Sequence, residues 1–423
     1  MLNNITGAIW IGSSQLVLLS ANFLLLKLLT SHLSIESFGF YSLCMTIVLF
    51  ARQVIYDPIS IVVAKECASS ANDPRRLIYW MSVVRFVTDR FALSLLVFGT
   101  LTFIFAIAAI ENYTRGIVIS SCLAYLAANG AQGIYFNVLN SITDRKSAAL
   151  FSMLDSVLKL FFVFLALQFI GSEIATALFS IAVGSFFVLL AVRSSIRNRI
   201  KFGGAAPKRL NVLVRRSLMM SIPLLLPSGL AAFKSVVDRW ILAAFVGVDE
   251  LAVYSVLLQL GYFPMILFIG VIQTFVGPRV YGFSAHNSEC GFDDLKRFVH
   301  KILFWVLILA CAAGGIAIGL SDFVFKLLVG EEYRVFSIYL PLFVFSGALA
   351  AAAGILHLAA IAVFKTSVVG KLMITSLALA VALASFSIIG WGFVGAVMAL
   401  MIASATTAFI YWAALYNAPF GRS

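Results

Sequence analysis

Eight ionisable side chains lie inside long apolar stretches of the 423-residue sequence, and their types limit the chemistry that the chain can do. Five are cations and three are anions, which leaves an excess of two positive charges. A charged side chain at the centre of a membrane-spanning helix costs about 2.5–3.5 kcal/mol on insertion scales, unless it is paired or hydrated. Most of the eight must therefore form ion pairs or line a wet cavity, and the excess of cations suits an anionic ligand. They are Lys27, Arg52, Asp57, Asp155, Lys159, Lys234, Asp238 and Arg239.

Two of the anions have a cation four residues away on the expected helix. Asp155 and Lys159 have this spacing, and so do Lys234 and Asp238. Residues four apart share one face of a helix and can form an ion pair there. Each pair is open to two interpretations: a self-neutralising pair that tolerates burial, or a pair that lines a cavity.

The remaining cations are the stronger candidates for contact with an anion. Arg52 and Asp57 are five residues apart, about 500° of helical rotation, so they do not stack on one face. Arg52 lies near the middle of its apolar stretch, and we expect it to line the cavity. Adding 213 to Lys27 gives the position next to Arg239, which suggests cations at similar depth in equivalent helices. The alternative for Lys27 is that its long side chain reaches back to the membrane surface.

The sequence lacks the patterns of the common catalytic and metal sites. There is no G-x-x-x-x-G-K-[ST] phosphate loop, no H-E-x-x-H and no G-x-S-x-G. The five cysteines are scattered and form no C-x-x-C pair, which argues against a zinc site or a disulfide framework. We therefore expect no enzymatic activity, no cofactor and no metal.

The elements that must position these residues are membrane-spanning helices. Of all residues, 62% are hydrophobic and 11% are charged, against about 25% charged in a soluble domain. About 20 consecutive apolar residues span the bilayer as a helix, and the apolar runs here are continuous, unlike the alternating strands of a barrel. We predict an all-α integral membrane protein with about twelve spans: 7–29, 39–64, 92–110, 115–139, 149–170, 174–192, 217–246, 251–278, 301–320, 337–361, 368–388 and 391–414.

The Lys and Arg residues between the expected spans predict the orientation. One set of alternate connections, with the C-terminus, holds 22 of them, and the other set holds three. Positive residues stay on the cytoplasmic side, so both termini are expected there. The net charge of +12 then reflects topology and gives no indication of nucleic-acid binding. The central connection, 193–216, carries eight of these residues and divides the chain into six-helix lobes at 1–205 and 206–423.

A short internal repeat supports the two lobes. Residues 35–42 read I-E-S-F-G-F-Y-S and residues 248–255 read V-D-E-L-A-V-Y-S, an offset of 213. Six spans separate the two segments, so the halves point the same way and the pseudo-twofold axis runs along the membrane normal. The aligned pairs are Glu36 with Asp249, Phe38 with Leu251, Tyr41 with Tyr254, and Ser42 with Ser255.

The same segments resemble a known family. The stretches L-S-I-E-S-F-G-F-Y-S at 33–42, S-I-P-L-L-L-P at 221–227 and D-R-W-I-L-A-A-F-V-G-V-D-E-L-A-V-Y-S at 238–255 are similar to polysaccharide flippases. These are the O-antigen and exopolysaccharide translocases of the multidrug/oligosaccharidyl-lipid/polysaccharide exporter superfamily. The resemblance implies two six-helix lobes around a central cavity and alternating access. It also implies an undecaprenyl-pyrophosphate-linked oligosaccharide as substrate, moved from the cytoplasmic to the outer leaflet of the bacterial inner membrane.

Two other functions stay open. A multidrug or cation antiporter of the same superfamily would carry organic cations, for which an excess of intramembrane anions is expected. A membrane polysaccharide polymerase would use carboxylates in an outer loop, here Asp322, Glu331 and Glu332. The expected partners are the lipid-linked oligosaccharide, membrane lipids, a coupling ion (H⁺ or Na⁺), and polysaccharide polymerase or chain-length proteins.

Overall fold

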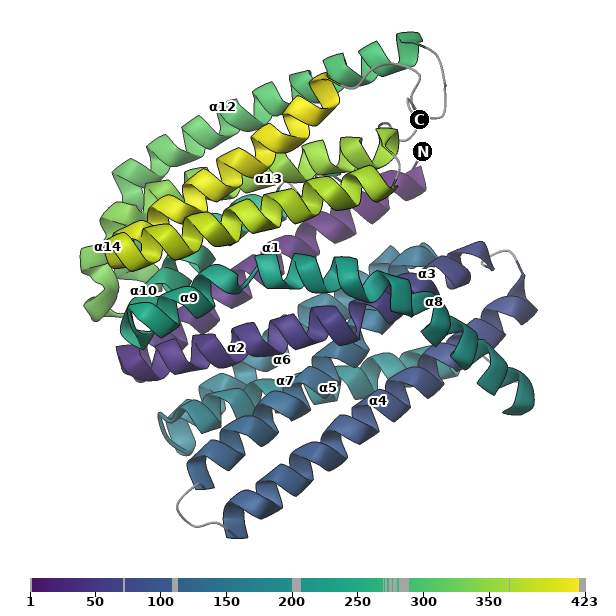
Figure 1. Cartoon of the computed structure of the whole chain (residues 1–423). Coiled ribbons are helices and arrows are strands. Elements are labelled where there is room, and N and C mark those ends of the chain that lie inside the picture. The colour runs from purple at the N-terminus through teal and green to yellow at the C-terminus, as the bar shows by residue number, and fades with distance from the viewer. Residues whose placement is uncertain are drawn as a thin grey trace. The chain divides into compact units, whose positions relative to one another are not determined.

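The chain is built from long α-helices with short connections, as the computed structural model shows (Figure 1). The structure describes residues 2–70, 73–108, 113–199, 207–268, 270, 272–273, 276, 280, 289–364 and 366–417, and none of these lies in a strand. The elements are α1 (Leu2–His32), α2 (Ile35–Ile55), α3 (Asp57–Ser69), α4 (Pro74–Ala108), α5 (Tyr113–Ser141), α6 (Arg145–Phe169), α7 (Ile174–Arg199), α8 (Pro207–Lys234), α9 (Val237–Phe245), α10 (Val248–Leu257), the π-helix η2 (Leu258–Tyr262), α12 (Glu289–Leu328), the 3₁₀-helix η3 (Glu331–Tyr339), α13 (Leu340–Val363) and α14 (Thr366–Tyr416).

The helices form two compact units, Met1–Ser235 and Val236–Ser423. The first unit includes α8, because α8 packs against α2, α3 and α4. The sequence placed the division of the six-helix lobes earlier, at 205–206, and that division stays a prediction.

The core of the first unit lies where α5 meets α3, α4 and α7. Small residues on α5 let these helices approach closely, since Ala127, Ala128 and Ala131 are almost wholly buried. Large side chains fill the space on either side of them, among them Tyr56, Trp80, Tyr135 and Ile134. The second unit is centred on α13, which packs against α12, α14 and η2.

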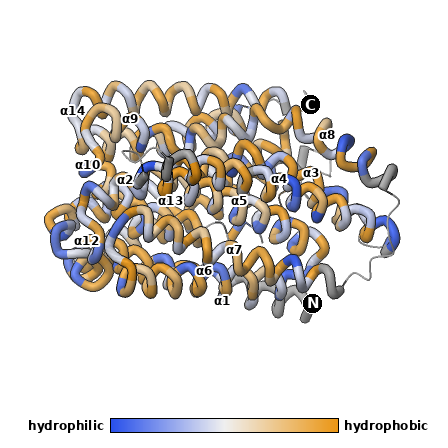
Figure 2. The backbone as a smooth tube through the Cα atoms, turned by 90° about the horizontal axis from the view of Figure 1, so that it is seen from below, coloured by the Kyte–Doolittle hydropathy of each residue, from blue (hydrophilic) through white to orange (hydrophobic). Residues whose placement is uncertain are grey.

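Ten helices in the described part of the chain are long and apolar enough to cross a membrane. One of them, 367–416, contains both of the last two expected spans. The expected span 92–110 is not among the ten; its described part, 92–108, lies in α4, which runs back through Arg85 and Arg90 to Pro74 as one helix of 35 residues, and 109–110 lie outside the described residues. Figure 2 shows hydrophobic residues along most of the length of the helices in both units. The prediction of an all-α, multi-pass membrane protein is therefore confirmed.

The helix α14 is a hairpin of two arms. Its 51 residues would reach about 76 Å if straight, far beyond a bilayer of about 30 Å. Gly392 has φ 56° and ψ −132° and reverses the chain, and Figure 1 shows the two arms side by side. Gly395 closes the turn, because a Cβ at that position would lie 1.9 Å from the backbone oxygen of Ser387. The two expected spans 368–388 and 391–414 are these arms.

Two expected spans are interrupted. The second breaks at Tyr56 between α2 and α3, one residue before Asp57 and Pro58. Proline has no backbone N–H to continue the helical hydrogen bonds, which accounts for this break. The seventh, expected as one helix over 217–246, is wrong as a continuous element: α8 ends at Lys234 and α9 begins at Val237.

The internal repeat is visible in the helix boundaries. In the first unit, α1 ends at His32 and α2 begins at Ile35. In the second unit, α9 ends at Phe245 and α10 begins at Val248. Both boundaries keep the offset of 213 found in the sequence. All four aligned positions behave alike, with the acidic residue in the first turn and the aromatic or leucine, Tyr and Ser residues buried.

Candidate functional site

Arg52 is held in the first unit by contacts from two elements. Its Nη1 donates to Asn129 Oδ1 on α5 at 3.0 Å, and its Nη2 lies 3.9 Å from Asp57 Oδ1. Both side chains of the ion pair keep about one third of their surface exposed (33% and 35%). The Nε of Arg52 is buried and has no hydrogen-bond partner in the described residues. The guanidinium is therefore fixed in place, yet its charge is only loosely compensated.

The break between α2 and α3 favours both charges at this position. Arg52 lies in the last turn of α2 and Asp57 is the first residue of α3. A cation near a helix C-terminus and an anion near a helix N-terminus are each stabilised by about 0.3–1 kcal/mol through the helix dipole. The two charges can thus remain in an apolar helix without a tight ion pair between them.

Gly130 allows the break to pack against α5. Tyr56, at the break, is 1% exposed, and a Cβ added at Gly130 would lie 2.4 Å from its ring. The neighbouring Asn129 supplies the amide that orients Arg52. Two turns further along, Asn137 Nδ2 donates to Ser60 Oγ at 2.7 Å and ties α5 to α3 in the same way.

Asp155 and Lys159 form a tight and shielded pair. Lys159 Nζ donates to Asp155 Oδ2 at 2.5 Å, and the two side chains are 14% and 12% exposed. Lys159 Nζ also lies 3.4 Å from Tyr125 OH and 5.1 Å from the centre of its ring. Ser185 Oγ donates to Asp155 Oδ1 at 3.4 Å. Of the two interpretations of this pair, the geometry supports the self-neutralising one.

In the second unit, Asp238 and Arg239 begin α9. Tyr254 OH, on α10, donates to Asp238 Oδ2 at 2.6 Å, while Asp238 Oδ1 is buried without a hydrogen-bond partner in the described residues. The guanidinium of Arg239 lies 5.8 Å from the ring centre of Phe263, in cation–π contact. Tyr254, one of the repeat residues, thus has a polar role that the sequence comparison did not reveal.

Phe263, whose ring is in cation–π contact with Arg239, directly follows the π-helix η2. Phe263 N–H bonds to Leu258 O, the wider spacing of a π-turn, directly before Pro264. Gly347 of α13 allows this turn to approach, because a Cβ there would lie 2.6 Å from Tyr262 O. π-turns of this kind are frequent at functional sites.

The last two predicted cations lie at or near helix ends. Lys27 is half-buried, one turn before the end of α1. Lys234 is the last residue of α8, so it does not share a continuous helix with Asp238 as the sequence suggested. Within the first unit, Arg52 thus lies near Asp57 and Lys159 pairs with Asp155. In the second unit, Asp238 and Arg239 are neighbours in the first turn of α9.

A further charged group was missed by the sequence analysis. Asp89 Oδ2 lies 2.8 Å from Arg193 Nη2 and 3.7 Å from Arg85 Nε, which joins α4 to α7. Arg85 and Asp89 lie in the first half of α4, the continuous helix Pro74–Ala108. This group borders a cavity of about 300 Å³ between α4, α5 and α7. The local signal was the spacing of four between Arg85 and Asp89, but Arg193 is 104 residues away.

The described residues bring together no group of three His, Cys, Asp or Glu side chains that could hold a metal ion.

Comparisons with known proteins found a matching sequence family and solved structures with a similar fold. A family model described as polysaccharide biosynthesis protein matches residues 5–280. No curated protein sequence matches the chain.

Several solved structures share the fold over almost the whole chain. The lipid II flippase MurJ, in an inward closed conformation, is similar over 98% of this chain and 88% of its own, with a TM-score of 0.69 and 14% identity. An inward-facing multidrug resistance MATE family transporter of the MOP superfamily is similar over 97% and 98%, with a TM-score of 0.64 and 14% identity. The Vibrio cholerae MATE transporter VcmN, in its bent form, is similar over 99% of both chains, with a TM-score of 0.59 and 14% identity.

Proposed function

Because the chain belongs to the polysaccharide biosynthesis protein family, we propose that it is a flippase for an anionic lipid-linked oligosaccharide. The substrate class is an undecaprenyl-pyrophosphate-linked repeat unit of a surface polysaccharide. The chain would carry it by alternating access from the cytoplasmic to the outer leaflet of the bacterial plasma membrane. The fold shared with a lipid II flippase supports this function.

The observation that carries the proposal is the environment of Arg52. A tight pair such as Asp155–Lys159, at 2.5 Å, has no charge to spare for a ligand. Arg52 lies 3.9 Å from its carboxylate and keeps one third of its side chain exposed. Arginine binds a phosphate through a planar fork of donors, and the exposed third of the Arg52 side chain is open to such a ligand. An arriving pyrophosphate can therefore take up hydrogen bonds that Arg52 does not use in the protein.

Arg239 is the proposed counterpart in the second unit. Its guanidinium lies 5.8 Å from the ring centre of Phe263, in cation–π contact. The carboxylate next to it in sequence, Asp238, already accepts a hydrogen bond from Tyr254. With the Asp155–Lys159 pair counted as neutral, the predicted residues still carry an excess of two positive charges. That excess suits a multivalent anion that must exchange its hydration for cation contacts.

Neutralisation of single cations tests the proposal. We expect Arg52→Ala and Arg239→Ala to lower export of surface polysaccharide at least tenfold, at unchanged protein level. Arg52→Lys should recover part of it, because an ammonium keeps the charge but cannot contact Asn129 and a phosphate with one planar fork. Arg115→Ala, at the exposed start of α5, is the matched control. Wild-type export in both alanine variants would overturn the proposed site.

Translocation in proteoliposomes separates this function from the other two. The fold shared with multidrug transporters makes efflux of organic cations the second candidate. Organic-cation efflux by purified protein that does not move a pyrophosphoryl-lipid glycan would favour it. For a polymerase, Glu331→Gln and Glu332→Gln should abolish chain elongation, whereas a flippase should retain transport. The coupling ion is proposed to be H⁺ or Na⁺, and imposing each gradient across the vesicles in turn identifies it.

A further inference from the structure

An apolar groove lies on the second unit between α12, α13 and α14. Its volume is about 270 Å³, near the lower end of the range for small-molecule pockets. The groove is lined almost entirely by hydrocarbon and aromatic side chains, so it suits a hydrocarbon chain. Its lining includes Leu307, Phe345, Leu349, Ala352, Ala408 and Phe409.

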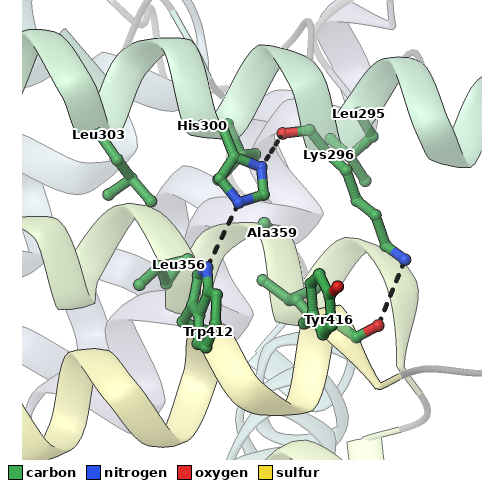
Figure 3. A pocket seen from close by; sticks show the side chains of 10 residues that line it. Leu295, Lys296, His300, Leu303, Leu356, Ala359, Trp412 and Tyr416 are labelled. Atoms are coloured by element: carbon green, nitrogen blue, oxygen red, sulfur yellow. Dashed lines mark hydrogen bonds between the residues drawn. The ribbon is translucent and has the colours of Figure 1, made fainter.

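One end of the groove carries polar and aromatic groups (Figure 3). A second, smaller pocket of about 20 Å³ lies next to the groove and shares Leu303, Leu356 and Trp412 with it. Lys296 and His300 of α12 border this end, and Tyr416 of α14 lies opposite them. Trp and Tyr side chains are enriched where membrane and water meet, because their rings are partly apolar and partly polar.

Hydrogen bonds fix the polar end in one arrangement. His300 Nδ1 lies 2.8 Å from Lys296 O, and Trp412 Nε1 donates to His300 Nε2 at 3.3 Å. These two contacts hold the imidazole between α12 and α14. Lys296 Nζ donates to Tyr416 O at 3.4 Å and lies 5.9 Å from the centre of the Tyr416 ring. Lys296 therefore lines the small pocket with its apolar stem, and its ammonium lies beside the pocket at the Tyr416 carbonyl.

From this geometry we propose that the groove binds one anionic glycerophospholipid. One hydrocarbon chain would lie in the apolar groove, and the phosphodiester would face Lys296. The proposal does not depend on the transported substrate, and it concerns a lipid that stays bound to the second unit.

The charge available at this end suits a singly charged headgroup. Among the described residues that line the groove and the small pocket, Lys296 is the only lysine or arginine. A phosphodiester carries one negative charge, which one lysine can balance, whereas a pyrophosphate carries more. One lysine beside an apolar groove thus favours an ordinary anionic membrane lipid over the pyrophosphate carrier.

Lipid retention by the purified full chain tests the inference. Native mass spectrometry in mixed micelles of phosphatidylglycerol and phosphatidylcholine should show one retained phosphatidylglycerol. Lys296→Gln should weaken its retention about fivefold, which corresponds to about 1 kcal/mol for one lysine near an anionic lipid. Ala352→Phe should abolish it by filling the groove. The matched controls are Lys326→Gln, at the far end of α12, and Ala312→Phe, at an exposed position of the same helix.

Further measurements distinguish binding of a phospholipid from binding of free phosphate. Inorganic phosphate at the same concentration should not raise the thermal stability of the protein, whereas phosphatidylglycerol should raise it by several degrees. Equal retention of the two phospholipids, or undiminished retention in Lys296→Gln, would overturn the inference. So would a polyprenyl pyrophosphate that binds the groove in preference to phosphatidylglycerol. Since Arg52 and Arg239 do not line this groove, export by the groove variants separates its failure from failure of the proposed transport.

Discussion

At the scale of single residues, partner distance and exposure separate cations that sequence spacing treats alike. Lys159 has a carboxylate at 2.5 Å, a phenol and an aromatic face around it, and little exposed surface. Arg52 has an amide at 3.0 Å, a carboxylate at 3.9 Å and an open flank. The first arrangement neutralises a charge inside the protein. The second holds the guanidinium in place and leaves about one third of the side chain exposed.

The Asp155–Lys159 pair is expected to be structural. Lys159→Met alone should destabilise the protein by about 3–5 kcal/mol, because it leaves the buried carboxylate without its cation. The double variant Asp155→Leu/Lys159→Met should recover most of that loss, since neither charge remains buried. Thermal unfolding in detergent measures both effects. Normal export by the double variant is expected, and its loss would show that the pair takes part in transport.

Gly130 is expected to control the position of Arg52 through Tyr56. Gly130→Ala places a Cβ within 2.4 Å of the buried Tyr56 ring, so the break between α2 and α3 must shift. Overpacking of this kind costs about 1–3 kcal/mol. Gly133→Ala, on the same helix with no atom within 4 Å of the added Cβ, is the control. Unfolding temperatures should fall for the first variant only, and export should fall with them.

At the scale of elements, the structure shows which features were encoded locally. The α2–α3 break follows from Pro58, and the hairpin of α14 follows from a glycine between two apolar runs. The two residues that separate α8 from α9, Ser235 and Val236, are neither proline nor glycine, so no local sequence pattern predicted the break after Lys234. The two prolines of this expected span, Pro223 and Pro227, lie inside the helix α8 and not at the break.

The turn of α14 is expected to require glycine. Gly392→Ala forces a side chain into φ 56° and ψ −132°, a conformation that costs about 1–3 kcal/mol for other residues. Gly390→Ala, two residues earlier in the helical arm with open space around the Cβ, should be neutral or slightly stabilising. Comparing the unfolding temperatures of the two variants gives the test. Equal values would mean that the reversal does not depend on the glycine conformation.

At the scale of the whole molecule, composition and hydropathy predicted the helical membrane fold, while contacts between distant segments escaped prediction. The i,i+4 spacing found the Asp155–Lys159 pair because both partners lie on one helix. Asn129 lies 77 residues from Arg52, and packing of α5 against α2 brings them together. A single sequence does not indicate which distant segments pack together. The candidate site was thus predicted as a set of charges, and their grouping required the fold.

The proposed orientation can be tested in both units with single cysteines in a cysteine-free background. Arg145 begins α6 and Glu173 lies in the connection after it, while Glu332 lies in η3 before α13 and Lys371 lies in the first arm of α14 after it. The distribution of Lys and Arg residues predicts that Glu173→Cys and Glu332→Cys react with an impermeant maleimide in intact cells. Arg145→Cys and Lys371→Cys should react only after permeabilisation. Labelling from opposite sides in the two units would contradict the parallel repeat.

The hairpin of α14 also bears on how the chain enters the membrane. The chain reverses at Gly392, between Trp391 and Phe393, so no charged group at the reversal has to pass through the hydrocarbon when the arms insert. Because Gly395 lies against the Ser387 carbonyl, the turn can form before either arm meets lipid. The translocon can then release both arms together as one preassembled apolar unit, with most backbone polar groups already satisfied. A bulky residue at Gly395 would thus impair biogenesis, and it would lower the amount of inserted protein rather than the turnover of each molecule.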